Sequence, residues 1–572
     1  MSSELTVNLG LRNEFDGAPY DLLCHTGNTN PELANTTGQP YVWPKCVDKF
    51  NLAGVTGTLN RAGLGNEYAT VFEPRIGFAY DLGGHHTTSI RGGYGIYSVR
   101  EDLGAADNLA ITPPAYPFGV NVLPELFGTC GATASCLANL FTANTGNPVF
   151  ALPGIPALGA NPTQPYAPVS SILQSFGSPC TLGNGAASTA PDQCGTNFSG
   201  TVNSLIELAV PLHWVVGTTQ QWNFTIQQAL GHDWFAELGY IGTKGSRLRS
   251  TYDPDQSTLA TTANPLTLTG AACANLQAAG QSCTIVDSTA ENVSARAPYL
   301  GIAPSDFEDF APNSDSSYNA LQATLAHHFG KGLYFQSAYT YAKSIDDVST
   351  ASVAFVTRVN NQTDAGASRG LSDFDRRQRL VTSGVYQLPF FAGAHGLEKG
   401  ALGGWEVSGV MILQSGAPFT VYDPAGGSAY NLASPASSAT FVSGYRCSNA
   451  ASSGSVTSRL GNWVNAAAYQ PDPTATLSNG TPSDATLYGN TPRNCIIGPP
   501  QKNVDFTLGK MFRITEGQAI RFRADFFNLF NHPSFAIPSA PTVGSAPGTG
   551  SAPITSTVGT PRLIQFSLKY SF

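Results

Sequence analysis

At 572 residues with only 12% charged side chains, the chain has about half the ionic content usual for a soluble globular protein. Its net charge of -9 excludes a typical nucleic-acid-binding protein, because phosphate recognition needs clustered Lys and Arg. No apolar run reaches the roughly 18 residues of a membrane helix, so any membrane-spanning structure must be a closed β-barrel.

Amphipathic segments with a period of two residues recur along the whole chain, which is the pattern of barrel strands. In chain order they are 5–12, 71–80, 88–98, 220–229, 234–242, 317–329, 333–343, 378–388, 403–414, 503–510, 519–528 and 562–572. Their number is twelve, and bacterial outer-membrane barrels have even strand numbers. The sequence therefore predicts an all-β protein, an antiparallel transmembrane β-barrel.

The last segment has the clearest alternation. One face carries Ile564, Phe566, Leu568, Tyr570 and Phe572, and the other carries Gln565, Ser567, Lys569 and Ser571. At a tilt near 40°, ten residues span about 25 Å, the height of the apolar band of an outer-membrane barrel. This segment is therefore predicted to be a membrane-spanning strand with one face toward lipid.

Short and long connections alternate strictly between the segments. The short ones are 81–84, 230–233, 330–332, 389–402 and 511–518, and the long ones are rich in Gly, Ser, Thr, Ala, Pro and Asn. Outer-membrane barrels have short periplasmic turns and long external loops. Every short turn then falls on the same side as the C-terminus, which predicts a periplasmic chain end and six external loops.

All ten cysteines lie in the predicted external loops, and each of these loops holds an even number of them. The sets are Cys24 with Cys46; Cys130, Cys136, Cys180 and Cys194; Cys273 with Cys283; and Cys447 with Cys495. This distribution predicts loop disulfides made in an oxidising compartment. The alternative is unpaired thiols, and the four-cysteine loop allows three connectivities, of which sequence neighbours are our preferred choice.

Six charged residues occupy predicted inward positions of the strands: Arg91, Glu237, Arg521, Arg523, Asp525 and Lys569. They could line a solute route or contact a plug, although ordinary ion pairing inside a lumen is the preferred explanation. Adjacent histidines such as His85 and His86, or His327 and His328, point to opposite faces of a strand and cannot share one metal ion. We therefore predict no metal site, no cofactor and no catalytic residues.

The acidic pairs Asp346 with Asp347 and Asp373 with Asp375 lack the spacing of a calcium loop. Arg376 and Arg377 are their predicted salt-bridge partners at a strand entrance. The chain also lacks the nucleophile-elbow, zinc-protease and phosphate-loop motifs, so nothing in it favours an enzyme.

Several stretches, in this order, resemble the barrel of TonB-dependent, Oar-like outer-membrane receptors. They are FEPRIGFAYDL (72–82), SIRGGYGIYSVRED (89–102), SSYNALQATLAHHFGKGLYFQSAYTYAKSIDD (316–347), SDFDRRQRLVTSGVYQLPF (372–390), LGGWEVSGVMILQSGAPFTV (402–421), NVDFTLGKMFRITEGQAIRFRADFFNLFNHPSF (503–535) and LIQFSLKYSF (563–572). The terminal residues Phe566, Leu568, Tyr570 and Phe572 resemble the aromatic ending that the barrel-insertion machinery recognises.

The resemblance implies a barrel of 22 strands filled by a plug and opened by a TonB-type energy-coupling protein. This chain has about twelve strand segments, and we identify no plug, no energy-coupling box, no export signal and no carboxypeptidase-regulatory-like domain in it. Residues 1–572 are therefore expected to be the C-terminal part of the barrel, lacking the N-terminal region through which the coupling protein would act. The alternative is twelve strands that close alone.

The expected location is the bacterial outer membrane, with membrane lipid as a partner. The resemblance implies transport of a bulky, still unknown ligand across that membrane. The alternative is a surface barrel whose loops act in adhesion or interaction without transport. A secreted soluble β-protein is a third hypothesis, which predicts that the chain stays in solution without detergent.

Overall fold

The computed structural model describes most of the chain from residue 215 onward and parts of the chain before it. The described ranges are 4–16, 69–99, 215–268, 282–298, 307–349, 358–391, 402–430 and 437–572, without residues 232, 291, 294, 295, 331 and 516, plus short pieces at 27–30, 41–44, 180–181, 187–188 and 207–209 and the single residues 273, 277, 398 and 400.

Twelve long strands form one antiparallel sheet in which each strand pairs with the next along the chain. They are β1 (Leu5–Asp16), β4 (Ala69–Asp81), β5 (Thr88–Val99), β9 (Gly217–Gly231), β10 (Trp234–Tyr252), β13 (Phe307–Gly330), β14 (Leu333–Asp346), β16 (Gln378–Gln387), β17 (Trp405–Gln414), β24 (Gln501–Arg513), β25 (Ala519–Phe527) and β26 (Leu563–Ser571). All twelve predicted segments are confirmed as strands. Two short strands, β8 (Glu207–Ala209) and β15 (Gly370–Leu371), pair with β13 and β14.

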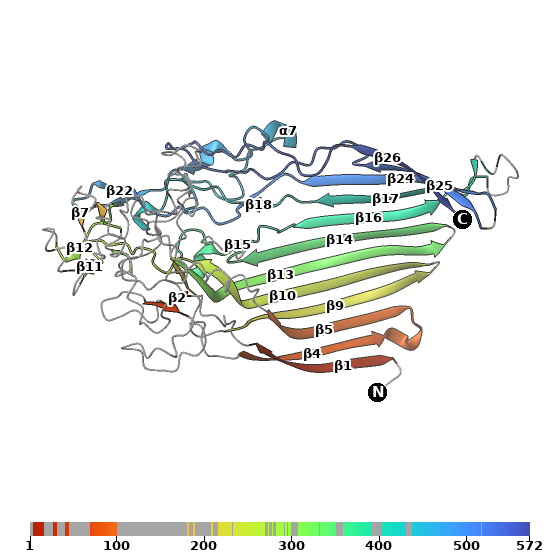
Figure 1. The fold of residues 1–572 in the computed structure, drawn as a ribbon, viewed down its shortest axis with the longest axis horizontal. Helices are drawn as coiled ribbons and strands as arrows, with labels where there is room; N and C mark the ends of the chain where they lie inside the picture. Colours follow the sequence, from red (N-terminus) through yellow and green to blue (C-terminus); the bar gives the residue numbers. More distant parts are fainter. Residues whose placement is uncertain are drawn as a thin grey trace, which may run out of the picture.

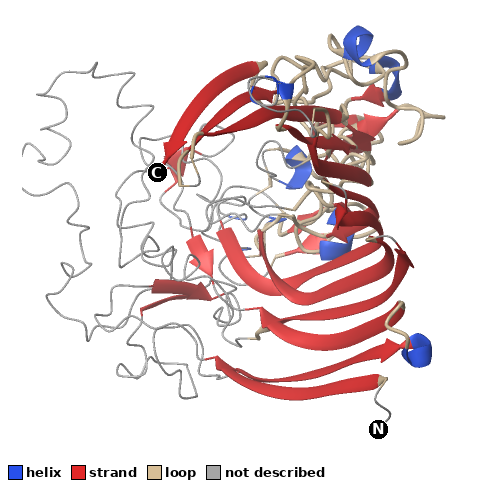
Figure 2. Ribbon diagram, turned by 90° about the vertical axis from the view of Figure 1, so that its right-hand side faces the viewer, coloured by secondary structure: helices blue, strands red, loops and turns tan. Residues whose placement is uncertain are grey.

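The sheet is curved like the wall of a barrel but is open. Viewed along the strands, it follows an arc, with the two chain ends at its two extremes (Figure 2). The strand order begins at β1 and ends at β26, and within the described residues these two strands pair only with β4 and β25. Within the described residues, the outer edges of β1 and β26 have no strand partner, so the twelve strands form an arc that does not close on itself.

Long and short connections lie at opposite ends of the sheet (Figure 1). The short turns need backbone conformations with positive φ: Gly231 (79°) and Asp233 (67°) join β9 to β10, and Gly332 (78°) joins β13 to β14. Glycine adopts these angles without a steric penalty. Both chain termini lie at the end with the short turns, which the sequence predicts for the C-terminus.

The two faces of the sheet differ sharply in polarity. Directly opposed residues of an antiparallel pair share a face, so the register assigns each side chain to one side. Most exposed large apolar side chains of the long strands lie on the same face, among them Leu9 (76% exposed), Leu568 (71%) and Phe566 (69%). We call this the apolar face and the opposite one the polar face.

Lys510 is a charged residue on the apolar face. It stands opposite Trp405 on β17 and Phe522 on β25. Its ammonium group lies 4.8 Å from the centre of the Trp405 ring and 4.9 Å from that of Phe512. The aromatic rings cover the lysine almost completely, leaving it 2% exposed, and they stabilise its charge by cation–π contact.

The hairpin of β10 and β13 is longer than predicted from the alternation pattern. The predicted segments are 234–242 and 317–329, whereas the strands continue to Tyr252 and begin at Phe307. The extension carries buried polar residues such as Glu308 and Asp309 in place of alternating apolar ones, so periodicity could not detect it. The pairing is bulged between Gly245 and Ser250.

Smaller elements occupy the connections. The strands are β2 (Gly27–Asn30), β3 (Tyr41–Pro44), β6 (Cys180–Thr181), β7 (Ala187–Ser188), β11 (Leu266–Thr267), β12 (Thr284–Ile285), β18 (Pro418–Phe419), β19 (Thr440–Phe441), β20 (Tyr469–Gln470), β21 (Thr474–Thr476), β22 (Pro482–Thr486) and β23 (Ile496–Ile497). The helices are η3 (Leu82–Gly84), η7 (Ala365–Ser368), η8 (Ser428–Tyr430), α7 (Val456–Arg459) and η9 (Ala466–Ala468). Across the described ranges, no helix is long and apolar enough to cross a membrane.

The described residues of the connections 415–500 and 528–562 pack together into a compact external unit, which we call the cap. Its core contains Phe419, Val421, Ala439, Ala450, Trp463, Val464, Ala468, Tyr469, Ile496, Val543, Ala552 and Ile554. Trp463 is 1% exposed, and its indole N–H donates to the carbonyl oxygen of Ile497 at 2.8 Å. The predicted external loops therefore include a folded module with its own hydrophobic core.

Candidate functional site

The charged residues that the sequence places inward lie on the polar face of the sheet, on strands from β5 to β26. The register puts six of them on that face: Arg91, Glu237, Arg521, Arg523, Asp525 and Lys569. Arg521 and Lys569 stand directly opposite each other on β25 and β26. The assignment of these residues to one face is a geometric result, and their role in a solute route stays a prediction.

The charged residues of β25 form a small polar network with the neighbouring strands. Arg523 contacts Asp525 at 2.8 Å, and the Thr507 hydroxyl donates to the same carboxylate oxygen at 2.6 Å. Arg521 lies 3.7 Å from the carboxylate of Glu406 on β17. Elsewhere on the polar face, Arg91 donates to the hydroxyl of Ser89 at 3.1 Å.

A second charged cluster lies on the polar face near the edge of the sheet and was not predicted. Glu73, which is 2% exposed, contacts Arg75 at 2.8 Å and Arg12 at 4.0 Å. The guanidinium of Arg75 lies 4.5 Å from the centre of the Tyr97 ring. Alternate charges in the stretch FEPR are the one sequence feature that could have indicated it, since residues 73 and 75 share a face of a strand.

Arg493 fastens the cap to the sheet. Its guanidinium contacts the carboxylate of Asp346 at the end of β14, donates to the Asp346 carbonyl oxygen at 2.7 Å, and lies 3.3 Å from Asp373. It also donates to the Ser368 carbonyl oxygen at 2.8 Å. Both Arg493 and Asp346 are buried. We call this set of contacts the arginine latch.

The arginine latch changes the interpretation of the acidic pairs. Arg376 and Arg377 were the predicted salt-bridge partners, and Arg377 does lie 3.9 Å from Asp375, whereas Arg376 donates to the backbone carbonyl of Asp375 at 3.0 Å. Asp347 pairs with Arg369 at 3.2 Å, and the cation that contacts Asp346 comes from 147 residues away along the chain. Local sequence cannot identify a partner at that separation.

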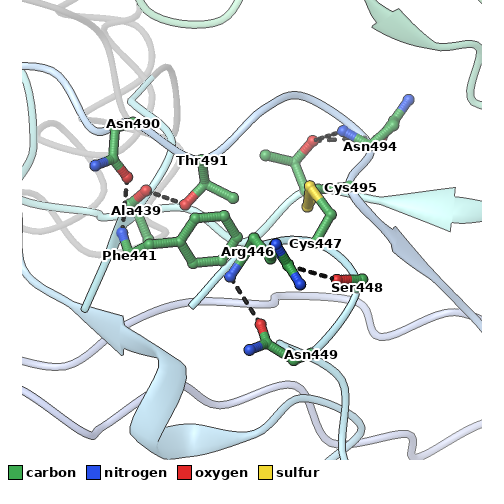
Figure 3. Close-up of a disulfide and its surroundings, with 11 residues drawn as sticks. Ala439, Phe441, Arg446, Cys447, Ser448, Asn449, Asn490, Thr491, Asn494 and Cys495 are labelled. Atoms are coloured by element: carbon green, nitrogen blue, oxygen red, sulfur yellow. Dashed lines mark hydrogen bonds between the residues drawn. A yellow bond between two sulfur atoms is a disulfide. The ribbon is translucent and has the colours of Figure 1, made fainter. Parts of the chain in front are cut away.

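Two of the predicted disulfides are present in the external loops: Cys273 with Cys283 and Cys447 with Cys495. The second closes a loop within the cap, where Arg446 donates its backbone N–H to the Asn449 side chain at 2.8 Å and Phe441 donates its own to Asn490 at 2.8 Å (Figure 3). Cys24, Cys46, Cys130, Cys136 and Cys194 lie outside the described residues, and so does the side chain of Cys180, whose backbone begins β6. Their pairing stays a prediction.

Two of the histidines, one in a short turn and one near the end of β13, have local structural contacts. The imidazole of His86 lies 2.5 Å from the carboxylate of Asp81, and the ring of His327 packs edge-on against Trp234 with centroids 4.7 Å apart. Within the part of the chain that the structure describes, no three His, Cys, Asp or Glu side chains group in a way that could hold a metal ion.

A cavity of about 640 Å³ lies on the polar face beneath the cap. Its walls come from the external ends of β17, β24 and β26 and from the connection between β25 and β26. Polar side chains that line it include Gln414, Asn503, Asp505 and Gln565. Sequence alternation places these residues in strands but does not distinguish them as a site, because the alternation is the same along the whole polar face.

The C-terminal strand presents its predicted assembly residues on the apolar face. Phe566, Leu568 and Tyr570 oppose Ala524, Phe522 and Ile520 of β25, and Phe572 is 94% exposed at the end of the chain. Recognition of these residues by the insertion machinery stays a prediction.

A curved antiparallel meander with one apolar exposed face, one polar face, and short turns opposite long loops defines the class of transmembrane β-barrel proteins. A family model described as outer membrane beta barrel domain matches residues 1–565. The chain belongs to this family, and the protein is therefore located in the bacterial outer membrane.

The fold is similar to that of solved outer-membrane proteins. These include the outer membrane transporter YddB from Escherichia coli (9% identity, TM-score 0.36, covering 88% of this chain and 41% of that one) and the ferric preacinetobactin receptor BauA from Acinetobacter baumannii (9%, 0.36, 100% and 40%). The ferripyoverdine receptor of Pseudomonas aeruginosa is a third (11%, 0.33, 88% and 34%). The chain spans less than half the length of each of them. No curated protein matches it.

Proposed function

We propose that the chain is the C-terminal part of an outer-membrane transport barrel that moves a bulky ligand across the membrane. The observation that carries this proposal is the cavity of about 640 Å³ on the polar face, directly beneath the folded cap. Such a volume suits capture of a ligand of the size of a typical small organic molecule or larger. The charged residues of the polar face would then line the route toward the periplasm.

We further propose that additional strands of the same polypeptide pair with the free edges of β1 and β26. Unpaired backbone N–H and C=O groups cannot be hydrated in the hydrocarbon region, so each free edge is costly in a membrane. The resemblance to TonB-dependent receptors implies a 22-stranded barrel with a plug and an energy-coupling segment. The solved proteins of similar fold are described as transporters and receptors, which agrees with this proposal.

The mass of the protein in isolated outer membranes tests the proposal of additional strands. A band well above that of a 572-residue chain on a denaturing gel supports it. A band at the mass of the 572-residue chain refutes it. Native gels would then show whether one copy or two copies of the chain form the barrel, and either result leaves the proposal refuted.

Transport is tested by solute depletion. Cells with and without the full-length gene are grown in the same complex medium, and the dissolved compounds are followed by mass spectrometry with and without a protonophore. We expect at least one compound to disappear only when the protein is present and the membrane is energised. Asp525→Asn should slow that loss, whereas Arg446→Gln, an exposed change on the cap, should not.

The alternative function is surface interaction without transport, and the cap favours it, because a folded external module is also what a binding surface for other cells would need. It predicts that the protein binds cells or matrix while no compound is depleted energy-dependently. That outcome would overturn the transport proposal.

A further inference from the structure

The cavity beneath the cap is built entirely on the polar face of the last strands. The register puts Ile412 and Gln414 of β17, Asn503 and Asp505 of β24, and Gln565 of β26 on that one face. The cavity is therefore a continuous surface across neighbouring strands, and residues from the segment 528–560 border it on the external side.

The roof of the cavity is held in place by its own hydrogen bonds. Asn528 adopts a positive φ of 48° and donates its backbone N–H to the carboxylate of Asp505 at 2.8 Å. Its side-chain amide accepts from the backbone N–H of His532 at 2.9 Å and donates to the carbonyl oxygens of His532 at 3.1 Å and Thr560 at 3.2 Å. A roof fixed in this way is preorganised, so a ligand would lose little affinity in ordering it.

Uncharged amides are the commonest hydrogen-bonding side chains in the cavity. Gln414 donates to Gln501, while no partner within the described residues was found for the side-chain amides of Asn503 and Gln565 or for the imidazole of His532. An amide offers both donors and an acceptor, which is the combination that vicinal hydroxyl groups can satisfy. The unpaired amides thus suit a ligand with many hydroxyl groups.

Charge excludes other ligand classes. Among the described residues that line the cavity there is no arginine. The register turns the side chain of Lys502 to the apolar face, and its backbone carbonyl accepts from the Ser534 hydroxyl at 3.2 Å. Anions such as phosphates or multiple carboxylates need charge-assisted donors, so they fit poorly. Asp505 is the single carboxylate among the described lining residues, and it already accepts a backbone hydrogen bond. One carboxylate does not supply enough oxygen ligands for a divalent cation.

Apolar side chains complete the walls between the amides. Ile412, Phe527, Val558 and Leu563 all line the cavity. A sugar ring has polar edges and apolar C–H faces, so amides and apolar walls together match it. Aromatic rings such as that of Phe527 supply flat contact surface. From this combination we infer that the cavity binds an uncharged saccharide, which deepens the proposed transport function and rests on it for its physiological meaning.

Binding is tested with the full-length protein in detergent, with maltotriose, cellotriose and xylotriose as neutral probes, citrate as the anionic probe and Mg²⁺ as the cationic one. Saturation-transfer NMR and calorimetry measure binding. We expect at least one of these trisaccharides to bind and citrate and Mg²⁺ not to bind. Asn503→Leu and Gln565→Leu, which remove the amide and leave an apolar side chain of similar size, should each weaken trisaccharide affinity about tenfold or more.

Gln322→Leu is the matched control, because Gln322 also points to the polar face but lies on β13, away from the cavity. It should leave trisaccharide affinity unchanged. The inference is overturned if no trisaccharide binds the folded protein, if citrate or Mg²⁺ binds as well as the trisaccharides, or if the two cavity variants bind like the wild type.

The outcome is separable from that of the transport proposal, since binding in detergent needs no energised membrane. Saccharide binding without energy-dependent depletion by cells would refute transport and keep this inference. Depletion of another compound class without saccharide binding would refute this inference and keep transport.

Discussion

The disulfide between Cys447 and Cys495 should control how often the cap opens. The perturbation is the paired change Cys447→Ala with Cys495→Ala, which removes the cross-link but keeps the half-buried site of Cys495 apolar. Its matched control is Cys273→Ala with Cys283→Ala in a different external loop. Both pairs are present as disulfides.

The expected magnitudes follow from the sequence separations of the two pairs, 48 and 10 residues. In the chain-entropy description, a cross-link restricts the unfolded loop by an amount that grows with the logarithm of its length. That gives about 4 kcal/mol for the cap disulfide and about 2.7 kcal/mol for the shorter loop. The difference of about 1.4 kcal/mol corresponds to about a factor of ten in the equilibrium of opening.

Limited proteolysis of outer-membrane vesicles measures these equilibria, because cleavage follows the population of the open form when reclosing is fast. Cleavage between residues 415 and 500 should rise by two to three orders of magnitude in the variant without the cap disulfide. Cleavage of this same segment should not change in the control variant, which keeps the cap disulfide. For each of the two loops, the cleavage rate of the variant that lacks its disulfide is compared with the wild-type rate in that loop.

Cleavage of the cap within about twofold of the wild-type rate would refute the chain-entropy argument. It would mean that the hydrophobic core around Trp463 holds the cap closed without the cross-link. Equal effects in the two loops would contradict the dependence on loop length.

Three further predictions concern the latch, the cap and the chain end. Arg493→Met should destabilise docking of the cap by about 3–5 kcal/mol, because it leaves Asp346 buried and unpaired; added Asp346→Asn should restore part of the melting temperature, and no recovery would contradict the charge argument. Burial raises the pKa of Asp472 to about 7, so the folded cap holds this proton more tightly than the unfolded chain does. Cap stability should therefore fall as pH rises from about 4 to 7 and level off above that, and Asp472→Asn should flatten the profile of protease resistance against pH. Deletion of Phe572 should reduce the amount of heat-modifiable barrel in outer membranes, whereas Phe530→Ala, which changes an external residue that is 72% exposed, should not; equal amounts would show that the terminal aromatic is no assembly signal.

The strands could be predicted from sequence because each one separates two environments. On β26, Phe566 and Leu568 lie on the apolar face while Gln565 and Lys569 lie on the polar one, and the pattern repeats with a strict period of two. Membrane-facing and lumen-type residues differ strongly in polarity, so alternation alone locates such a strand. The polar face and its charged residues follow from the same alternation.

The cap could not be predicted in this way. Its core joins Val421, Trp463, Ile496 and Val543, which are scattered through polar, Gly-rich and Ser-rich segments without periodicity. The residues of the cavity likewise resemble other residues of the polar face in sequence. They differ only in that the segment 528–560 packs over them. Contacts between distant loops depend on tertiary structure, and a single sequence carries no local pattern for them.

The strict succession of neighbouring pairs in the sheet bears on how such a surface can change during evolution. Each long strand pairs with the next one, so every external segment only has to bring back a strand that is already adjacent. The segment between β5 and β9 is roughly four times as long as that between β14 and β16, yet closing it costs only about 1.2 kcal/mol more in chain entropy. Insertions between strands are therefore nearly neutral for the wall of the barrel. The external segments can therefore evolve new recognition surfaces while the membrane-spanning strands stay unchanged.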